Sequence, residues 1–317
     1  MRHSNAARPA RAHSFGRSFA LAPVALALAA SLPASALTIV PTYVSVDPTA
    51  QTVINTVLAG YATMLNDPVT VNIRFLGMTS GLGQSSTYGY TINYANFMTA
   101  LRADATSATD TAAMASVALG ANPVTGSTSI QVTRAQASAV GINTLYTPDG
   151  VTDWDSDISL NFGLMNFTRT GPINSGKYDL QATVQHEVNE VLGTVSGVGD
   201  SATTLIRPID LFRYDAAGAR SFGVRSDKGY LSLDGNVNTT NGYNNAGSGD
   251  TGDFDSAIVR VQNAFGTPGA TTVQMGIEVA MLDAVGFTLA PVPEPGTYAM
   301  LLAGLGVLSL VARRRKA

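Results

Sequence analysis

One short segment of the chain carries side chains whose types and spacing suit metal chemistry. His186 and Glu190 are four residues apart, so on a helix both side chains point to one side and can bind one ion. Imidazole nitrogen and carboxylate oxygen both suit zinc. Glu187, next to the first ligand, is placed to deprotonate a metal-activated water and to pass the proton to a leaving amine. The segment therefore predicts a zinc-dependent endopeptidase with Glu187 as general base.

A simpler interpretation of the same residues is the solvated face of an amphipathic helix. The scarcity of the residue types argues against it. His186 is the only histidine after residue 36, and Glu187 and Glu190 are two of the four glutamates in the chain. Their clustering favours a shared chemical role.

The surrounding sequence predicts helices packed on a sheet, which is an α+β fold. Apolar residues recur at helical spacing over 49–65 and alternate, as in a half-buried strand, over 69–76. The segment with His186 falls in a helix over 178–192 that Gly193 ends, so its polar face borders a cleft. Similar patterns predict further helices over 94–101, 108–119 and 278–287, and a strand over 158–162.

The part of the chain after Gly193 is predicted to be rich in loops. Residues 236–255 are mostly Gly, Asn, Asp and Thr, which indicates either a surface loop ordered by a cation or a flexible insert. Two groups of closely spaced aspartates suggest structural calcium as one hypothesis and a solvated acidic loop as the other. The groups are Asp153, Asp155 and Asp157, and Asp250, Asp253 and Asp255.

The N-terminal end resembles a secretory leader. Residues 1–36 contain four arginines and no acid, then an apolar run, then Ala34-Ser35-Ala36. We therefore expect signal peptidase to remove residues 1–36. An N-terminal membrane anchor is the alternative, but the apolar run of about 14 residues is shorter than the roughly 20 that a spanning helix needs.

The C-terminal end, residues 291–317, has three parts. Pro293-Glu294-Pro295 precedes an apolar run over 298–312 and a basic end over 313–316. This order resembles the PEP-CTERM sorting signal of Gram-negative bacteria, which implies transient anchoring in the inner membrane and processing by an exosortase. The processed protein is expected at the cell surface or outside the cell, where extracellular polysaccharide is a further possible partner. A plain single-span anchor is the alternative.

The expected body, residues 37–290, is long enough for one domain with a substantial core. Without the four leader arginines and the four tail cations, 11 of 19 cations and 21 of 22 acids remain, a net charge of about −10. Such a charge argues against nucleic acid as a partner. The chain has no cysteine, which excludes disulfides and thiol catalysis, and Trp154 is its one tryptophan, which lends a carbohydrate-binding role little support.

At the His186 helix the sequence resembles the metzincin clan of zinc peptidases, whose pattern is H-E-x-x-H-x-x-G-x-x-H. Here Glu190 stands at the second histidine and Ser196 at the third, while Gly193 matches. It is more similar to a divergent bacterial group of PEP-CTERM-tailed metalloproteases with H-E-[IV]-x-E-V-[LM]-G. Residues 210–214, 264–269 and 282–287 share in this resemblance. It implies a metzincin-like fold, with a twisted mixed sheet packed on helices, the active-site helix, and a loop-rich C-terminal subdomain.

The resemblance also bears on the residues around the metal. Asp210 lies in the segment where the clan returns beneath its metal and is the first candidate for the third ligand, and Asp200, nearer in sequence, is the second. Tyr214 stands where a clan tyrosine stabilises the oxyanion. The missing histidines leave an alternative function, a non-catalytic surface or matrix protein on a degenerate metalloprotease fold.

Overall fold

The computed structural model describes residues 36–117, 120–143, 154–201, 205–237, 239–272, 275–291, 303–308 and 313–314. Its strands are β1 (Thr38–Val44), β2 (Thr70–Gly77), β3 (Gly83–Thr87), β4 (Gly89–Asn93), β5 (Ser129–Thr133), β6 (Ser156–Leu160), β7 (Met165–Asn166), β8 (Tyr178–Asp179), β9 (Arg213–Tyr214) and β10 (Tyr230–Leu231). Its α-helices are α1 (Pro48–Met64), α2 (Tyr94–Asp104), α3 (Ala108–Ser116), α4 (Arg134–Ala139), α5 (Leu180–Asn189) and α6 (Gly276–Ala284). The predicted α+β class is confirmed.

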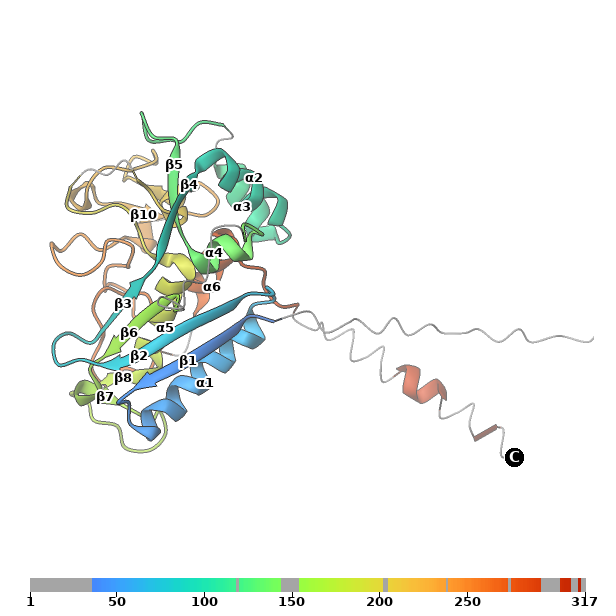
Figure 1. Cartoon of the computed structure of the whole chain (residues 1–317), viewed down its shortest axis with the longest axis vertical. Coiled ribbons are helices and arrows are strands. Elements are labelled where there is room, and N and C mark those ends of the chain that lie inside the picture. Colours follow the sequence, from blue (N-terminus) through green and yellow to red (C-terminus); the bar gives the residue numbers. More distant parts are fainter. Residues whose placement is uncertain are drawn as a thin grey trace, which may run out of the picture. The chain divides into compact units, whose positions relative to one another are not determined.

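The main sheet is mixed and has the strand order β1-β2-β6-β3 (Figure 1). β1 and β6 run parallel to β2, and β3 runs antiparallel to β6 at the edge of the sheet. Alternate residues of β2 and β6 are buried on one face, as the predicted period indicates. On the other face Arg74 lies opposite Asp157 in the register and forms an ion pair with it.

Helices α1 and α5 cover the buried face of this sheet. α1 packs against β1 and α5, and α5 packs against β3 (Figure 1). Asp47 caps α1 by accepting a hydrogen bond from Thr49 N at 2.7 Å, and Pro48 occupies the first turn, where no backbone donor is needed. The main hydrophobic core therefore lies between the sheet and these two helices, with α5 beside the antiparallel edge strand.

The part of the chain between β3 and β6 forms elements outside the main sheet. β4 and β5 form an antiparallel pair, and α2 and α3 fall between them in the chain. Ser107 and Asp110 form a capping box at the start of α3. Residues 118–119 of the helix predicted over 108–119 lie outside the described residues.

The C-terminal part is built largely from loops, as predicted, with two-residue strands and short 3-10 helices over Pro208–Phe212, Arg225–Asp227 and Thr239–Asn241. Within 236–255, however, Tyr243 and Phe254 are buried and stack with their ring centroids 5.8 Å apart. The amide of Asn244 donates to the carbonyl oxygens of Ser248 and Asp250. Residues 243, 244 and 251–254 of this segment are therefore buried, whereas residues 245–250 are exposed.

Candidate metal centre

The helix that carries the chemical motif begins two residues later than the sequence pattern predicts. Tyr178 and Asp179 form β8, and Asp179 caps α5 by accepting a hydrogen bond from Gln181 N at 3.1 Å. The helix continues into a π-helical turn over Glu190–Thr194 and ends at Gly193, whose φ of 118° is open to glycine. His186, Glu187 and Glu190 thus occupy the last turns of α5 and its π-helical extension.

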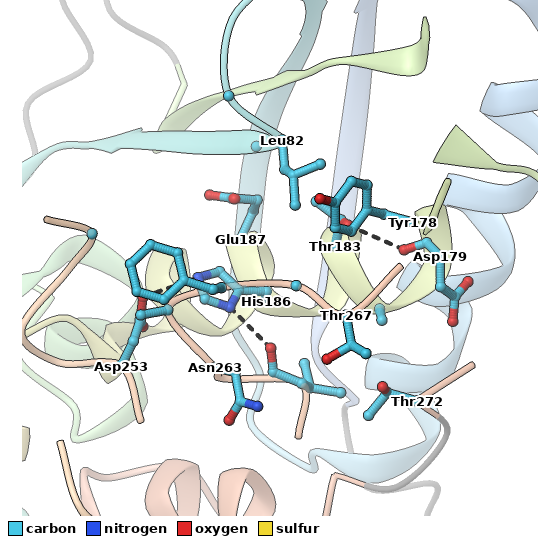
Figure 2. Close-up of a pocket in the computed structure, with 18 of the residues that line it drawn as sticks. Leu82, Tyr178, Asp179, Thr183, His186, Glu187, Asp253, Asn263, Thr267 and Thr272 are labelled. Carbon is cyan, nitrogen blue, oxygen red and sulfur yellow. Dashed lines mark hydrogen bonds and ion pairs between the residues drawn. The ribbon is translucent and has the colours of Figure 1, made fainter. Parts of the chain in front are cut away.

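A loop from the C-terminal part brings a third side chain to this helix end. A Cβ on Gly252 would lie 2.7 Å from Ser196 N and 3.0 Å from Thr194 O, so only glycine allows the loop to approach the turn this closely. The next residue, Asp253, lies with its Oδ2 3.5 Å from His186 Nε2 (Figure 2). Glu190 Oε1 is 3.6 Å from the same nitrogen. Among the described residues, His186, Glu190 and Asp253 are the one group whose ligand atoms lie within 4.8 Å of one another.

In each of these three side chains, one polar atom forms a hydrogen bond within the protein and another faces a common point between the three side chains. His186 Nδ1 is 2.9 Å from Val261 O, which can only accept a hydrogen bond, so the neutral imidazole carries its proton on Nδ1 and its lone pair on Nε2. Glu190 Oε2 accepts a hydrogen bond from Ser85 Oγ at 2.6 Å, and Asp253 Oδ1 accepts one from Gln262 Nε2 at 2.9 Å. Partners of this kind orient metal ligands and select the ligating atom.

The spacing and the charge of the cluster fit a divalent ion. A tetrahedral zinc ion with bonds of about 2.1 Å holds its ligand atoms roughly 3.4 Å apart. The distances from His186 Nε2 to Asp253 Oδ2 and Glu190 Oε1, 3.5 and 3.6 Å, are close to this value. The side chains of Glu190 and Asp253 are only 6% and 4% exposed, so their charges are largely removed from water. Two buried carboxylates with one imidazole need positive charge to be stable.

The ionisable groups of the cluster perturb one another strongly. Burial raises the pKa of Asp253 to about 7, although His186 opposes the shift. Burial alone would lower the pKa of His186, but the charges of Asp253 and Glu190 raise it well above its usual value. Burial acts to raise the pKa of Glu190, yet contacts with His186 and Ser85 lower it overall. The raised pKa of His186 thus reflects the negative charge that Asp253 and Glu190 bring to the cluster.

Glu187 lies beside the cluster but outside it. Its side chain extends toward Leu82 and β3, as Figure 2 shows, and its Oε2 is buried without a hydrogen-bond partner. Burial first, and the charge of Glu190 second, raise the pKa of Glu187 well above its usual value. A Cβ on Gly83 would lie 2.3 Å from Glu187 Oε1, so the glycine provides the space that this carboxylate occupies. Such a group is suited to accept and release a proton in a cleft.

His186, Glu187 and Asp253 line a cleft of about 830 Å³. One wall is formed by the edge strand β3 and the residues before it, and the other by residues 259–267. Leu164, Val259 and Phe265 also line the cleft and are 40%, 50% and 44% exposed. The cleft thus combines a polar floor with an apolar rim.

Neither aspartate that the sequence suggested as third ligand belongs to the cluster. Asp200 is 70% exposed and forms an ion pair with Arg225 at 2.6 Å. Asp210 is buried, but its oxygens accept hydrogen bonds from Ser196 Oγ, Gly197 N and Arg207 N, so it holds a turn together. Asp253 stands in their place.

Tyr214 is likewise not among the residues that line the cleft. Its ring stacks on Tyr230 with the centroids 6.0 Å apart, and the guanidinium of Arg220 lies 4.8 Å from its centroid. The tyrosine therefore has a packing role in this structure, outside the cleft that His186 lines. Tyr178, in β8 just before α5, does line the cleft.

The two groups of aspartates considered for calcium have different surroundings, and Asp250 and Asp253 of the second group both line the cleft. Asp155 accepts a hydrogen bond from Asn72 N and pairs with Arg134, whereas Asp157 pairs with Arg74. Arginines thus already neutralise both carboxylates, and Asp153 lies outside the described residues. In the second group, Asp253 turns toward His186, while Asp255 accepts a hydrogen bond from Ala257 N. The sequence analysis thus named Asp253 in a calcium hypothesis, whereas the structure places it beside His186.

Comparison with known proteins identifies one segment. Residues 291–316 match the PEP-CTERM protein-sorting motif. No significant match was found among curated proteins or among solved structures. The protein is therefore exported to the surface or the exterior of a Gram-negative bacterium, and its processing by an exosortase follows from the same motif. Among the described residues, no helix combines the length and the apolar character needed to cross a membrane.

Proposed function

We propose that this protein is an exported, zinc-dependent endopeptidase of metzincin-like fold, in which His186, Glu190 and Asp253 hold the metal. The observation that carries the proposal is the shared pattern of the three side chains, each with one atom fixed by the protein and one facing a common point. Three protein ligands with one position left for solvent is the arrangement of catalytic rather than structural zinc sites.

Bound zinc would lower the pKa of a water molecule in this cleft toward about 7. Glu187 would take up the proton of that water, since its carboxylate lies in the cleft beside the cluster and its Oε2 has no hydrogen-bond partner. The raised pKa of Glu187 suits it to pass that proton to the leaving amine. His186 and the two carboxylate ligands keep their positions because Val261, Ser85 and Gln262 hold their other polar atoms.

The shape of the cleft favours an extended polypeptide as the substrate. β3 pairs with β6 on one side only, and Gly83, Gln84 and Ser85 line the cleft. An edge strand offers backbone donors and acceptors to a further extended segment. The exposed rim of Leu164, Val259 and Phe265 favours apolar side chains in that segment.

The test is cleavage of an unfolded protein such as reduced casein by the purified full chain in mild detergent. We expect cleavage that stops with a chelator and returns with zinc. Glu187→Gln should bind zinc normally and cleave at least about a hundredfold more slowly, because a general base contributes that much or more. Asp200→Asn, at an exposed ion pair away from the cluster, is the matched control and should retain activity.

Full activity of Glu187→Gln would contradict the mechanism. Zinc binding by the wild-type chain without cleavage of any unfolded protein would instead favour the alternative, a non-catalytic surface protein.

A further inference from the structure

A line of buried hydrogen bonds connects helix α1 to the proposed ligand Asp253. Tyr61 Oη lies 2.7 Å from Asn189 Oδ1, and Asn189 Nδ2 donates to Gln262 Oε1 at 3.2 Å. Gln262 Nε2 then donates to Asp253 Oδ1 at 2.9 Å. Tyr61, Asn189, Gln262 and Asp253 are 1%, 0%, 0% and 3% exposed, so water does not compete for these bonds.

The hydrogen bonds of this line all run the same way, with each donor on the side of Tyr61 and each acceptor on the side of Asp253. A primary amide has one end that accepts hydrogen bonds and one that donates them. The Tyr61 hydroxyl lies 2.7 Å from Asn189 Oδ1 and 3.0 Å from Gln185 O, and donation along the shorter contact turns the Asn189 nitrogen toward Gln262. The nitrogen of Gln262 then faces Asp253. The reverse direction would set Gln262 Oε1 against a carboxylate oxygen of Asp253, which is a repulsive contact between two acceptors.

Gln262 itself is fixed at all four of its polar groups. Besides the two bonds of its side chain, its backbone N–H donates to Glu278 Oε1 of α6 at 3.1 Å. Its carbonyl oxygen accepts from Phe254 N at 2.8 Å. The residue before it, Val261, holds Nδ1 of His186. Residues 261–262 thus hold two of the three metal-facing side chains, and α6 holds this pair in place.

We propose that Gln262 is a positioning residue for the metal, and that Asn189 and Tyr61 set the direction of its amide. Gln262 donates a hydrogen bond to Oδ1 of Asp253, so that Asp253 would bind the ion through Oδ2 alone. A carboxylate held in this way binds through one oxygen and leaves space at the ion for solvent and substrate. The inference rests on the proposed function for the role of the ion, but its test measures metal binding by itself.

The test uses Co²⁺ as a probe, because its visible absorption reports the number and arrangement of its ligands. Gln262→Met removes both amide groups at similar side-chain volume, Asn189→Leu removes the middle amide, and Tyr61→Phe removes one hydroxyl. Gln51→Met is the matched control, since the amide of Gln51, in the first turn of α1, donates to Val46 O just before the helix. Each chain is titrated with Co²⁺ and Zn²⁺, and the thermal unfolding of the chelated form is measured alongside.

We expect Gln262→Met to weaken binding of both metals by about 10- to 100-fold, as loss of an orienting partner does, and to change the Co²⁺ spectrum. Asn189→Leu should have a smaller effect and Tyr61→Phe the smallest, while Gln51→Met should match the wild-type chain. A purely structural role would lower the unfolding temperature and leave the spectrum unchanged.

The outcomes separate the two proposals. Wild-type affinity and spectrum in Gln262→Met would overturn the positioning role and leave the proposed function intact. Metal binding that depends on Gln262 in a chain that cleaves no substrate would support the positioning role and reject the peptidase. Absence of metal binding by the wild-type chain would overturn both.

Discussion

Replacing Asp253 by asparagine tests which aspartate completes the metal site. The substitution keeps the side-chain shape, and the amide oxygen of asparagine can still accept the hydrogen bond that Gln262 Nε2 donates at 2.9 Å. The atom that faces His186, at 3.5 Å, becomes an amide nitrogen, which does not bind zinc. The change also removes one charge from a side chain that is 4% exposed. The chelated chain should therefore be no less stable than the wild type.

The expected loss of affinity follows from the number of ligands. Structural zinc sites with four protein ligands bind with an apparent free energy of about 10–16 kcal/mol, or about 3 kcal/mol for each ligand. Since about 1.4 kcal/mol corresponds to a factor of ten, Asp253→Asn should weaken zinc binding by at least about a hundredfold.

The assay is competition for zinc with a chromophoric chelator at neutral pH, with Asp200→Asn as the control at an exposed carboxylate. The control should bind zinc like the wild-type chain. Unchanged affinity in Asp253→Asn, or a large loss in Asp200→Asn, would refute the assignment of the third ligand.

Three further predictions concern the surroundings of the site. Gly83→Ala places a Cβ 2.3 Å from Glu187 Oε1 and should displace the Glu187 carboxylate. We expect kcat to fall by about a hundredfold while the affinity for zinc stays within a factor of two. An unchanged kcat would contradict the role of Gly83 in providing space for Glu187. Asp210→Asn weakens three hydrogen bonds to a buried carboxylate and should lower the free energy of unfolding by about 2 kcal/mol without changing zinc affinity, as chemical denaturation and zinc titration can show. Burial raises the pKa of Asp253 to about 7, and protons compete with zinc for this side chain, so the affinity for zinc should be at least about tenfold weaker at pH 6 than at pH 8. Calorimetry should also find that zinc binding releases protons. A zinc affinity that does not change with pH would exclude a protonated ligand.

The sequence predicted the local part of the candidate site and missed the long-range part. His186 and Glu190 were found because helical spacing alone brings them to one side of α5. Asp253 reaches them through a loop, and the approach depends on the contact of Gly252 with Thr194 and Ser196, which no periodicity reveals. The resemblance to metzincins pointed to Asp210, which holds a turn instead.

The fold shows the same division. α1, α2 and β2 were predicted with nearly their observed bounds because their apolar residues follow the period of a helix or strand. β3 was missed because its sequence is polar, and its side chains are not buried. β1 contains Pro41. Proline is tolerated in a strand at the edge of a sheet, and β1 lies at such an edge. The pairing of β3 with β6, which places Ser85 beside Glu190, depends on contacts between distant parts of the chain.

The most direct test of the central claim is anomalous diffraction at the zinc absorption edge from crystals of the zinc-loaded chain. We predict one anomalous peak, about 2.0–2.2 Å from His186 Nε2, Glu190 Oε1 and Asp253 Oδ2. A peak bound by other residues, or none under saturating zinc, would contradict the claim that these three side chains form a metal centre.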